Sequence, residues 1–501
     1  MQYNPNSMSR LSVLLVFSWL ALAQTPAARR IDALLRKSSA AVRTHWGIEV
    51  VDLRSGKPVY RRNAGQYFVP ASNTKLFSTA LALTRLGPDH RMHTLVLADA
   101  APDSSGTLQG GLRLCGGGDT TLSGREIPYR KDARPGDPLQ AIEALADQVA
   151  ARGVRRIEGD IVGDDTAYVW APHAEGWGMD DAVWEYGAPV SALVVNDNAF
   201  TLTLRPGARA GDPATIALEP PFPHFAIHNL AQTAAGGGRE IHLNRRAGSR
   251  EIEIWGRIPA GDPGIERVLA LEDPALYAAE VLRDALLRRG VTVTGRAVAR
   301  HLDPSLVADP KSAEPEPPPG GVELARRTSP PLVEMLRVAD KISQNLHAEV
   351  MLREVGRVRR NIGSREAGLE ELKALLGEAG APQDGYSIHD GSGLSRLNLL
   401  TPETVGKLLA FMERSRYRDQ WIGLLPVGGE DGTLSARFQG TAAAGRVRAK
   451  TGTMTHVSAL SGYLDRRDGR RYAFSIFANN YHAKDAEIRG LIDQIVNLLV
   501  D

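Results

Sequence analysis

The chain has 501 residues, and its 60 Lys and Arg against 58 Asp and Glu give a formal net charge of +2. This balance, without a long basic run, argues against a nucleic-acid partner. The single cysteine, Cys115, rules out an internal disulfide framework and a cysteine-based zinc site, and no His-Glu-x-x-His pattern occurs. The length leaves room for roughly two to four domains with a large core.

The N-terminal segment has the pattern of an export signal. Arg10 precedes the apolar stretch LSVLLVFSWLALA at residues 11–23, which is too short to cross a bilayer and ends in small residues. We expect residues 1–23 to be a signal peptide cleaved after Ala23, with Met1 or Met8 as the true start. The mature protein would then be exported to the periplasm or the cell-wall space. No later stretch is long and apolar enough for a transmembrane anchor.

Two predicted hairpins lie near opposite ends of the mature chain. Residues 46–61 predict the first hairpin, and a helix that starts near Ser72 and ends at Gly87 follows it. Residues 458–478 predict the second hairpin, which a C-terminal amphipathic helix follows. The simplest arrangement is one sheet assembled from both chain ends, with helices packed against it. This is an α/β (α+β) fold class, and the middle of the chain would be an insertion.

The middle of the chain contains two similar helix–strand units. Residues 138–163 give a helix, an Arg-Gly-Val turn and a strand, and residues 274–300 repeat this plan. A Pro/Glu-rich linker without core-forming residues follows at 304–319. We therefore expect an insertion of two small α/β subdomains. The predicted division is 92–319 for the insertion with its linker, and 24–91 with 320–501 for the terminal domain.

Ser72 and Lys75 are the first residues with a clear chemical interpretation. They lie three apart at the start of the predicted helix, so their side chains share one face. The positive end of the helix favours a developing alkoxide and disfavours a second positive charge, which would help the lysine accept the serine proton. The alternative is an N-cap serine beside a surface lysine, because a Ser-x-x-Lys pattern arises by chance once or twice in about 500 residues.

Two further motifs lie after the linker. Ser343-Gln344-Asn345 lies where one predicted helix gives way to another, and Lys450-Thr451-Gly452 begins a strand that leads into the second hairpin. Each motif alone has an ordinary structural explanation: a helix cap, an exposed polar side chain or an edge-strand charge. The three motifs in this order favour a serine acyl-transfer enzyme, because class A β-lactamases and penicillin-binding proteins carry the same trio.

Further segments resemble the D-alanyl-D-alanine carboxypeptidase/endopeptidase family of the penicillin-binding protein 4 type, the low-molecular-mass class C penicillin-binding proteins. The segments are GGGD (116–119), YGAPVSALVVNDN (186–198), SQNLHAE (343–349), DGSGLSR (390–396), LPVGGEDGTL (425–434) and AKTGTMTHVSALSGY (449–463). The resemblance implies a β-lactamase/transpeptidase-like domain, an antiparallel sheet with helices on both sides, which carries a large insertion between its first two motifs.

The resemblance also implies roles for the motif residues. Ser72 would be the nucleophile that forms an acyl-enzyme, and Lys75 its general base and the candidate base for deacylation. Ser343 would relay a proton to the leaving amine, and Asn345 would hold the substrate amide.

The remaining motif residues would bind the substrate. Lys450 would bind its terminal carboxylate together with the hydroxyl of Thr451 or Thr453, and would keep Lys75 neutral by its charge. The resemblance places an oxyanion hole at the backbone N–H groups of Ser72 and Thr453. Gly452 would leave space for a substrate along the strand edge.

Other polar residues near these motifs have weaker interpretations. Asp165, in the insertion, could bind the amino end of a diamino-acid side chain, with a loop-capping role as the alternative. Asp390 and Ser392 fit a tight turn better than catalysis. His389 and His456 are not required by the mechanism, and we interpret both as structural.

The implied activity is hydrolysis of D-Ala-D-Ala peptides, with cleavage of peptidoglycan cross-links as a second candidate. Peptidoglycan stem peptides and β-lactams are the implied partners, and the mechanism requires no metal or cofactor. A β-lactamase is the nearest rival, since it uses the same acyl-enzyme but deacylates quickly. A non-catalytic cell-wall-binding protein is the rival from another class.

Overall fold

The computed structural model describes residues 26–133, 135–246, 248–315 and 319–501. The predicted signal peptide therefore lies outside the described residues. Among the helices of the described ranges, none is long and apolar enough to cross a membrane.

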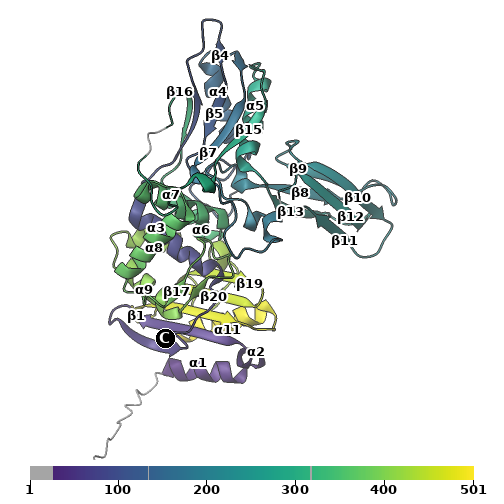
Figure 1. The fold of residues 1–501 in the computed structure, drawn as a ribbon. Helices are drawn as coiled ribbons and strands as arrows, with labels where there is room; N and C mark the ends of the chain where they lie inside the picture. The colour runs from purple at the N-terminus through teal and green to yellow at the C-terminus, as the bar shows by residue number, and fades with distance from the viewer. Residues whose placement is uncertain (1–25, 134, 247, 316–318) are drawn as a thin grey trace, which may run out of the picture.

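The base of the molecule is a five-stranded antiparallel sheet built from both chain ends (Figure 1). The strands lie in the order β19-β20-β21-β1-β2. Their bounds are β1 (His45–Asp52), β2 (Lys57–Arg62), β19 (Val447–Met454), β20 (Val457–Asp465) and β21 (Arg471–Asn479). The two predicted hairpins meet where β1 pairs with β21, with Trp46 opposite Ala478. Strands from near both ends of the described chain thus form one sheet.

Helices cover both faces of this sheet, because its side chains alternate between two cores. Leu460 and Ile476 belong to the core under α1 and α11, whereas Ala459 and Phe477 belong to the core on the other face. On the first face lie α1 (Pro26–Lys37), α2 (Ser39–Val42) and α11 (Asp485–Leu498). The other face carries α3 (Lys75–Leu86), α6 (Leu332–Lys341), α7 (Asn345–Arg360), α8 (Arg365–Glu378), α9 (Pro402–Glu413) and α10 (Arg418–Leu424), with the short pair β17 (Tyr386–Ser387) and β18 (Leu399–Leu400). The expected fold class is confirmed.

The insertion rises from the opposite side of the helical layer (Figure 1). Its main sheet has the order β15-β7-β5-β3-β16, and a three-stranded sheet has the order β14-β6-β4. The strands are β3 (His93–Ala98), β4 (Thr107–Gln109), β5 (Leu112–Cys115), β6 (Arg156–Glu158), β7 (Ile161–Val169), β14 (Thr292–Val293), β15 (Ala297–Leu302) and β16 (Val322–Thr328), and the helices are α4 (Gln140–Ala151) and α5 (Pro274–Arg288).

The two helix–strand units lie side by side in one subdomain. Strand β14 pairs in parallel with β6, β15 pairs in parallel with β7, and α4 packs on α5. The units share one layer because strands this short cannot cover a helix alone. The structure therefore differs from the expectation of two α/β subdomains, since the described residues between the units form strands and short 3₁₀ turns but no α-helix.

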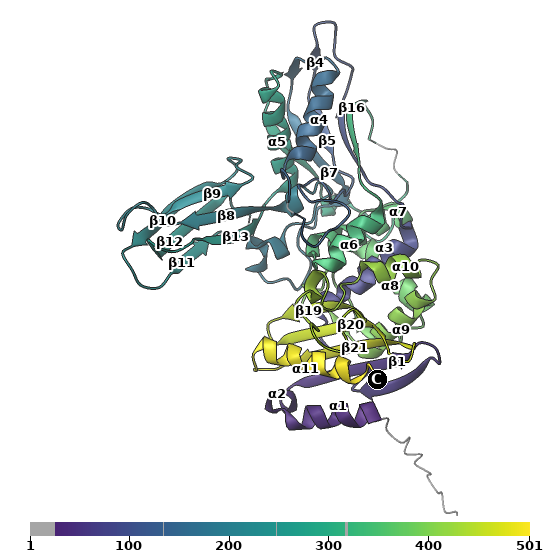
Figure 2. The ribbon, with the colours of Figure 1, turned by 180° about the vertical axis from the view of Figure 1, so that it is seen from behind.

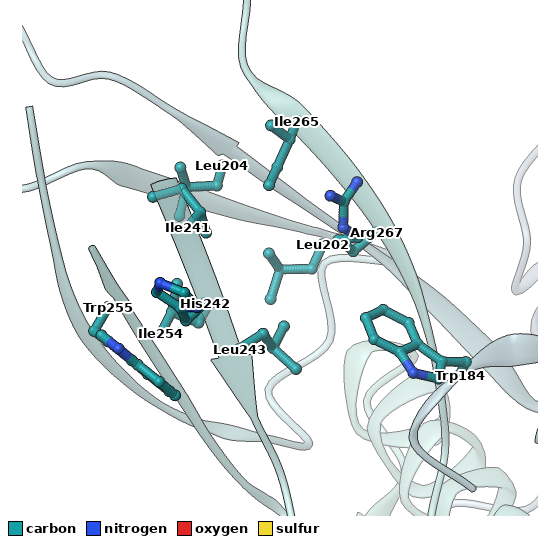
Figure 3. A pocket seen from close by; sticks show the side chains of 10 residues that line it. All are labelled: Trp184, Leu202, Leu204, Ile241, His242, Leu243, Ile254, Trp255, Ile265 and Arg267. Atoms are coloured by element: carbon teal, nitrogen blue, oxygen red, sulfur yellow. The ribbon is translucent and has the colours of Figure 1, made fainter. Parts of the chain in front are cut away.

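This second part of the insertion is a pair of three-stranded sheets that projects sideways (Figures 1 and 2). One sheet has the order β10-β12-β11 and the other β13-β8-β9. The bounds are β8 (Ala199–Arg205), β9 (Thr215–Glu219), β10 (Ala226–Ala234), β11 (Glu240–Asn244), β12 (Glu251–Pro259) and β13 (Ile265–Ala270). A cavity of about 340 Å³ lies between the sheets, and its lining includes the apolar residues Leu202, Leu243 and Ile265 as well as Trp184 (Figure 3).

Antiparallel pairing of β3 with β16 joins the insertion to the helical layer. Strand β16 follows the Pro-rich segment, so its residues belong to the insertion's sheet although they lie beyond the predicted boundary at 319. After β16 the chain enters α6, the first helix after the insertion.

Close packing of α5 on β7 leads to a stability prediction. A Cβ added at Gly163 would lie 1.9 Å from the carbonyl oxygen of Ala275, in the first turn of α5. Gly163→Ala should therefore push α5 off the sheet and lower the unfolding free energy by about 1–3 kcal/mol. Thermal unfolding of purified protein would measure this loss. Gly236→Ala, where an added Cβ meets no atom within 4 Å, is the control. Equal melting temperatures for the two variants would contradict the prediction.

Candidate active site

Ser72 lies in a short 3₁₀ turn, Ala71–Thr74, that leads directly into α3. Pro70 precedes this turn, and Ala71 has a positive φ of 46°, which bends the chain sharply into the helix. Gly87, with a φ of 82°, ends α3 and donates its N–H to the carbonyl of Leu83. Ser72 is therefore held at the start of the helix by rigid elements on either side.

Lys75 is fully buried, and its Nζ joins three segments of the chain. Nζ lies 2.8 Å from Ser72 Oγ, 2.6 Å from Asn345 Oδ1 and 2.7 Å from the carbonyl oxygen of Ser392. A neutral amine has two N–H groups and one lone pair. If the two N–H groups donate to Asn345 and Ser392, the lone pair faces the Ser72 hydroxyl and can accept its proton.

Burial is the main reason why the pKa of Lys75 lies well below its usual range. The positive charge of Lys450 lowers this pKa further, and three buried carboxylates oppose the change. The sequence had suggested the helix terminus and a neighbouring charge as causes. The structure makes desolvation the larger effect.

Ser343 and Lys450 form a second pair. Ser343 lies between α6 and α7 with a φ of 64°, a left-handed backbone conformation that residues other than glycine rarely adopt. The Nζ of Lys450 donates to Ser343 Oγ at 2.8 Å and to the carbonyl of Thr451 at 2.9 Å. Lys450 is fully buried, and burial lowers its pKa to about 8.

Asn345 connects the two motif pairs to the insertion. It is the first residue of α7, its Oδ1 accepts from Lys75, and its Nδ2 donates to the carbonyl of Tyr186 at 2.7 Å. Both ends of its amide are therefore engaged. In this arrangement Asn345 positions the Lys75 amine, which is more than the substrate contact that the sequence suggested.

Strand β19 packs directly against the turn that carries Ser72. Asn73 Nδ2 donates to the carbonyl of Lys450 at 3.2 Å, and a Cβ at Gly452 would lie 2.7 Å from the carbonyl oxygen of Pro70. The structural reason for Gly452 is thus contact with the turn itself, whereas the sequence had suggested space for a substrate. Thr453 is exposed beyond it, and Thr451 Oγ1 donates to Thr433 Oγ1 at 2.9 Å.

The DGSGLS loop supplies a hydrogen-bond partner of Lys75 that the motifs did not predict, the carbonyl of Ser392. Asp390 is buried and accepts the backbone N–H groups of Gly393 and Ser395, at 2.8 and 2.6 Å, so its role is to shape the turn. The carbonyl of Ser392 then faces Lys75. Glu349 Oε1 accepts the N–H of Ser392 at 2.8 Å and fixes the loop from α7. The sequence contained one indication that Glu349 lies near the site, since it follows Asn345 by four residues and so shares its helical face.

Asp340, in the last turn of α6, is a buried carboxyl that was also missed. Burial raises its pKa to about 7, and the charge of Lys450 is the largest effect in the opposite direction, with a smaller one from Lys75. Asp340 therefore offsets part of the positive charge that the two lysines would otherwise bring into the interior.

One segment of the insertion, residues 171–186, reaches the site. Trp177 Nε1 donates to Asp390 at 3.0 Å, and Arg353 on α7 donates to the carbonyl of Ala171 at 3.1 Å. The carbonyl of Tyr186 accepts from Asn345 as described. Residues 171–186 thus contact both α7 and the DGSGLS loop.

Asp165 is placed elsewhere. It is only 1% exposed, its Oδ2 accepts from Ser191 Oγ at 2.8 Å, and its Oδ1 lies 2.8 Å from His301 Nδ1. Within the described residues, none of the motif side chains is among its hydrogen-bond partners. These contacts fit the capping alternative and connect β7 to β15.

The other residues raised by the sequence lie in structural positions. His389 Nε2 lies 3.1 Å from Ser387 Oγ, and His456 Nδ1 lies 2.8 Å from the carbonyl of Tyr481. Cys115 is buried in β5, and burial raises the pKa of its thiol to about 11. Over the described ranges, no group of three or more His, Cys, Asp or Glu could hold a metal ion.

The fold and these motifs define a class of protein. An antiparallel sheet between helical layers, with Ser-x-x-Lys at a helix start, Ser-x-Asn between helices and Lys-Thr-Gly on the edge strand, is typical of penicillin-binding proteins and serine β-lactamases.

Comparison with known proteins identifies the family. The model of the D-Ala-D-Ala carboxypeptidase 3 (S13) family matches residues 27–500, so the chain belongs to this family. The chain is 36% identical to a D-alanyl-D-alanine carboxypeptidase from Actinomadura sp. (strain R39), over 91% of this chain and 81% of that protein. It is 28% identical to a penicillin-sensitive carboxypeptidase A from Dictyostelium discoideum, over 92% and 88% of the two chains. The predicted family is confirmed.

A solved structure gives the same result for the fold. The crystal structure of penicillin binding protein 4 (dacB) from Haemophilus influenzae superposes with a TM-score of 0.77 at 22% identity. The alignment covers 94% of this chain and 98% of that chain. The insertion is therefore included in the shared fold.

The pKa of Lys450 predicts an alkaline limit for acylation. Because burial lowers this pKa to about 8, Lys450 is a cation below pH 8 and loses its charge as the pH rises through 8. The second-order rate constant for acylation by a fluorescent penicillin should fall about tenfold per pH unit above that value, since the penicillin carboxylate loses its cationic partner. Lys450→Arg, which stays charged, should flatten this limb whatever its absolute rate. A rate that keeps rising to about pH 10 would contradict the assignment.

The contacts of Asp165 predict a role in stability. Burial alone would lower the pKa of His301, but its hydrogen bonds to Asp165 and Asp273 raise this pKa to about 9. The folded state therefore holds an extra proton between about pH 6.5 and 9, so this contribution is complete at low pH and lost as the pH rises through 9. Asp165→Asn should lower the urea midpoint at about pH 6, just below this range. At about pH 9.5, just above it, the midpoint should be nearly unchanged.

The same variant tests the substrate-binding alternative. Because both carboxylate oxygens of Asp165 are engaged by Ser191 and His301, the KM for a stem peptide with a free amine should change no more than the KM for its N-acetylated form. A selective rise in KM for the free amine would contradict this prediction and indicate that Asp165 binds the substrate.

Proposed function

We propose that the protein is an exported, serine-type D-Ala-D-Ala carboxypeptidase that acts on peptidoglycan stem peptides and is inhibited by penicillin. The observation that carries this proposal is the fully buried Lys75 amine, 2.8 Å from Ser72 Oγ. The name of the Actinomadura relative supports the same activity. The signal-peptide pattern at residues 1–23 supports export to the periplasm or cell-wall space.

In the acylation step, Ser72 Oγ attacks the carbonyl carbon between the two D-alanines. The neutral Lys75 amine takes the hydroxyl proton, and the new C–O bond forms as the carbonyl becomes an oxyanion. The backbone N–H groups of Ser72 and Thr453 stabilise this oxyanion. One such donor is worth about 10²–10³ in rate.

Collapse of the tetrahedral intermediate breaks the C–N bond. Ser343 passes a proton to the leaving D-alanine amine, and Lys450, whose Nζ lies 2.8 Å from Ser343 Oγ, replaces that proton. The proton that Lys75 took from Ser72 then returns the charge to Lys450, so Lys75 is a neutral amine again before water enters. The Lys450 cation and the hydroxyls of Thr451 and Thr453 hold the terminal carboxylate. Water then attacks the acyl-enzyme with Lys75 as base, which releases the shortened peptide and restores Ser72.

A β-lactamase would use the same groups for acylation, and the two activities differ only in how fast water resolves the penicilloyl-enzyme. Incubation with a fluorescent penicillin separates them. We expect a label that stays on Ser72 through electrophoresis, together with release of D-alanine from a diacyl-D-Ala-D-Ala peptide. Rapid penicillin turnover without a label would favour a β-lactamase. Neither label nor D-alanine would favour a non-catalytic cell-wall-binding protein.

Lys75→Arg tests the proposed base directly. A guanidinium stays protonated at any working pH, so acylation should fall by at least about 10³-fold. The matched control is Lys407→Arg, on the exposed side of α9. Normal labelling of Lys75→Arg would overturn the role of Lys75.

Cleavage of cross-links is the second activity to be measured. Digestion of purified peptidoglycan, with the products identified by mass, separates loss of terminal D-alanine from conversion of dimers to monomers. Conversion of dimers by wild-type protein but not by Ser72→Ala would add endopeptidase activity at the same site.

A further inference from the structure

Helix α1 has one buried face and one strongly basic face. Ala28, Ile31 and Leu35 are buried in the core shared with α11. Arg29, Arg30, Arg36 and Lys37 are all exposed, and helical periodicity places them on the side opposite the buried residues. The outward face of α1 therefore carries four cations close together.

The surrounding segment has the same charge. Residues 26–62, which form α1, α2 and the β1–β2 hairpin, contain nine Lys or Arg and three Asp or Glu, although the whole chain is nearly balanced. The three carboxylates already have partners: Asp32 with Tyr60, Glu49 with Arg61, and Asp52 with Arg470. Within the described part of the chain, the four cations of α1 form no ion pair.

A groove with a basic rim runs between α1 and α11. Its volume is about 420 Å³, and its lining combines Ala33, Leu34 and Leu498 with the side chains of Arg30 and Lys37. Gln494 and Asn497 complete the wall on α11. A lining that combines apolar side chains with two exposed cations suits an amphiphile with an anionic head.

This surface lies at the far end of the molecule from the insertion (Figures 1 and 2). Helices α1 and α11 cover the face of the sheet opposite α3, which begins at Lys75. Contact through α1 would therefore leave the Ser72 side and the insertion free.

We propose that the outward face of α1, together with the α1–α11 groove, docks the protein on an anionic phospholipid surface. The four cations lie against the lipid phosphates, and the groove accepts part of an acyl chain below Arg30 and Lys37. Charge complementarity supplies most of the attraction, so docking is reversible and weakens as salt is added. A nucleic acid or another polyanion would use the charges but not the apolar groove.

Sedimentation with vesicles tests this docking. The chain from Gln24 onward should bind vesicles of phosphatidylcholine with about 30% phosphatidylglycerol, and should bind pure phosphatidylcholine vesicles far less. Binding should fall steeply between about 0.05 and 0.5 M NaCl. The variant Arg29→Gln/Arg30→Gln/Arg36→Gln/Lys37→Gln should lose roughly 600-fold in partitioning, because each of the four cations near an anionic surface contributes about fivefold.

A matched variant controls for net charge. Arg152→Gln/Arg155→Gln/Lys373→Gln/Arg414→Gln removes four exposed cations that form no ion pair with another described residue and lie away from α1. It should bind the anionic vesicles within about threefold of wild type. Both variants should keep normal penicillin labelling, which separates a failed docking surface from a failed active site or fold.

Two results would overturn the proposal. One is an equal loss of binding in the two charge variants, which would make the attraction a property of net charge alone. The other is full displacement from the vesicles by glycerol phosphate at an ionic strength matched with NaCl, which would reduce the groove to a phosphate site. Leu34→Asn adds a test of the groove. It should weaken binding to anionic vesicles without changing the salt dependence.

Discussion

The desolvated amine of Lys75 is the constraint on which the site depends. A primary amine enclosed by protein needs partners for each of its polar positions, and here they come from three distant parts of the chain. The Ser72 turn, the first residue of α7 and the DGSGLS loop all meet at Nζ. The same contacts that satisfy the buried amine also place Nζ 2.8 Å from the Ser72 hydroxyl oxygen. Structure and reactivity therefore have one cause.

The charges around this amine explain several buried residues at once. Two lysines and three carboxylates in this region, Asp340, Glu349 and Asp390, are fully buried. Buried charges are tolerated only when they are paired or strongly hydrogen-bonded. Asp390 accepts backbone N–H groups, and Glu349 binds both the loop and Arg353 at 3.1 Å. Neither carboxylate oxygen of Asp340 has a hydrogen-bond partner among the described residues, and burial raises the pKa of this group to about 7. These carboxylates raise the pKa of Lys75, yet desolvation outweighs them. The balance leaves an amine of lowered pKa next to a serine hydroxyl.

The sequence predicted the motifs well because each has a fixed spacing within one element. Ser72 and Lys75 share a helix start, and Lys450 and Gly452 share a strand, so local geometry alone brings them to one face. The carbonyl of Ser392 could not be predicted in this way, since backbone direction in a loop depends on tertiary contacts such as those of Glu349. The two α/β subdomains were expected because each helix–strand unit looked complete. However, β6 pairs with β14, more than a hundred residues away in the sequence, and this pairing joins both units in one subdomain.

The contacts of the insertion make it part of the site. Asn345 holds Lys75 through Oδ1 and the carbonyl of Tyr186 through Nδ2. An amide held at both ends has a fixed orientation, so the insertion determines which atom of Asn345 faces the amine. Trp177 does the same for Asp390, which in turn shapes the loop that carries Ser392. Two of the three partners of Lys75 are thus oriented by residues 171–186. The long segment between the first two motifs therefore helps to fix the surroundings of the Lys75 amine.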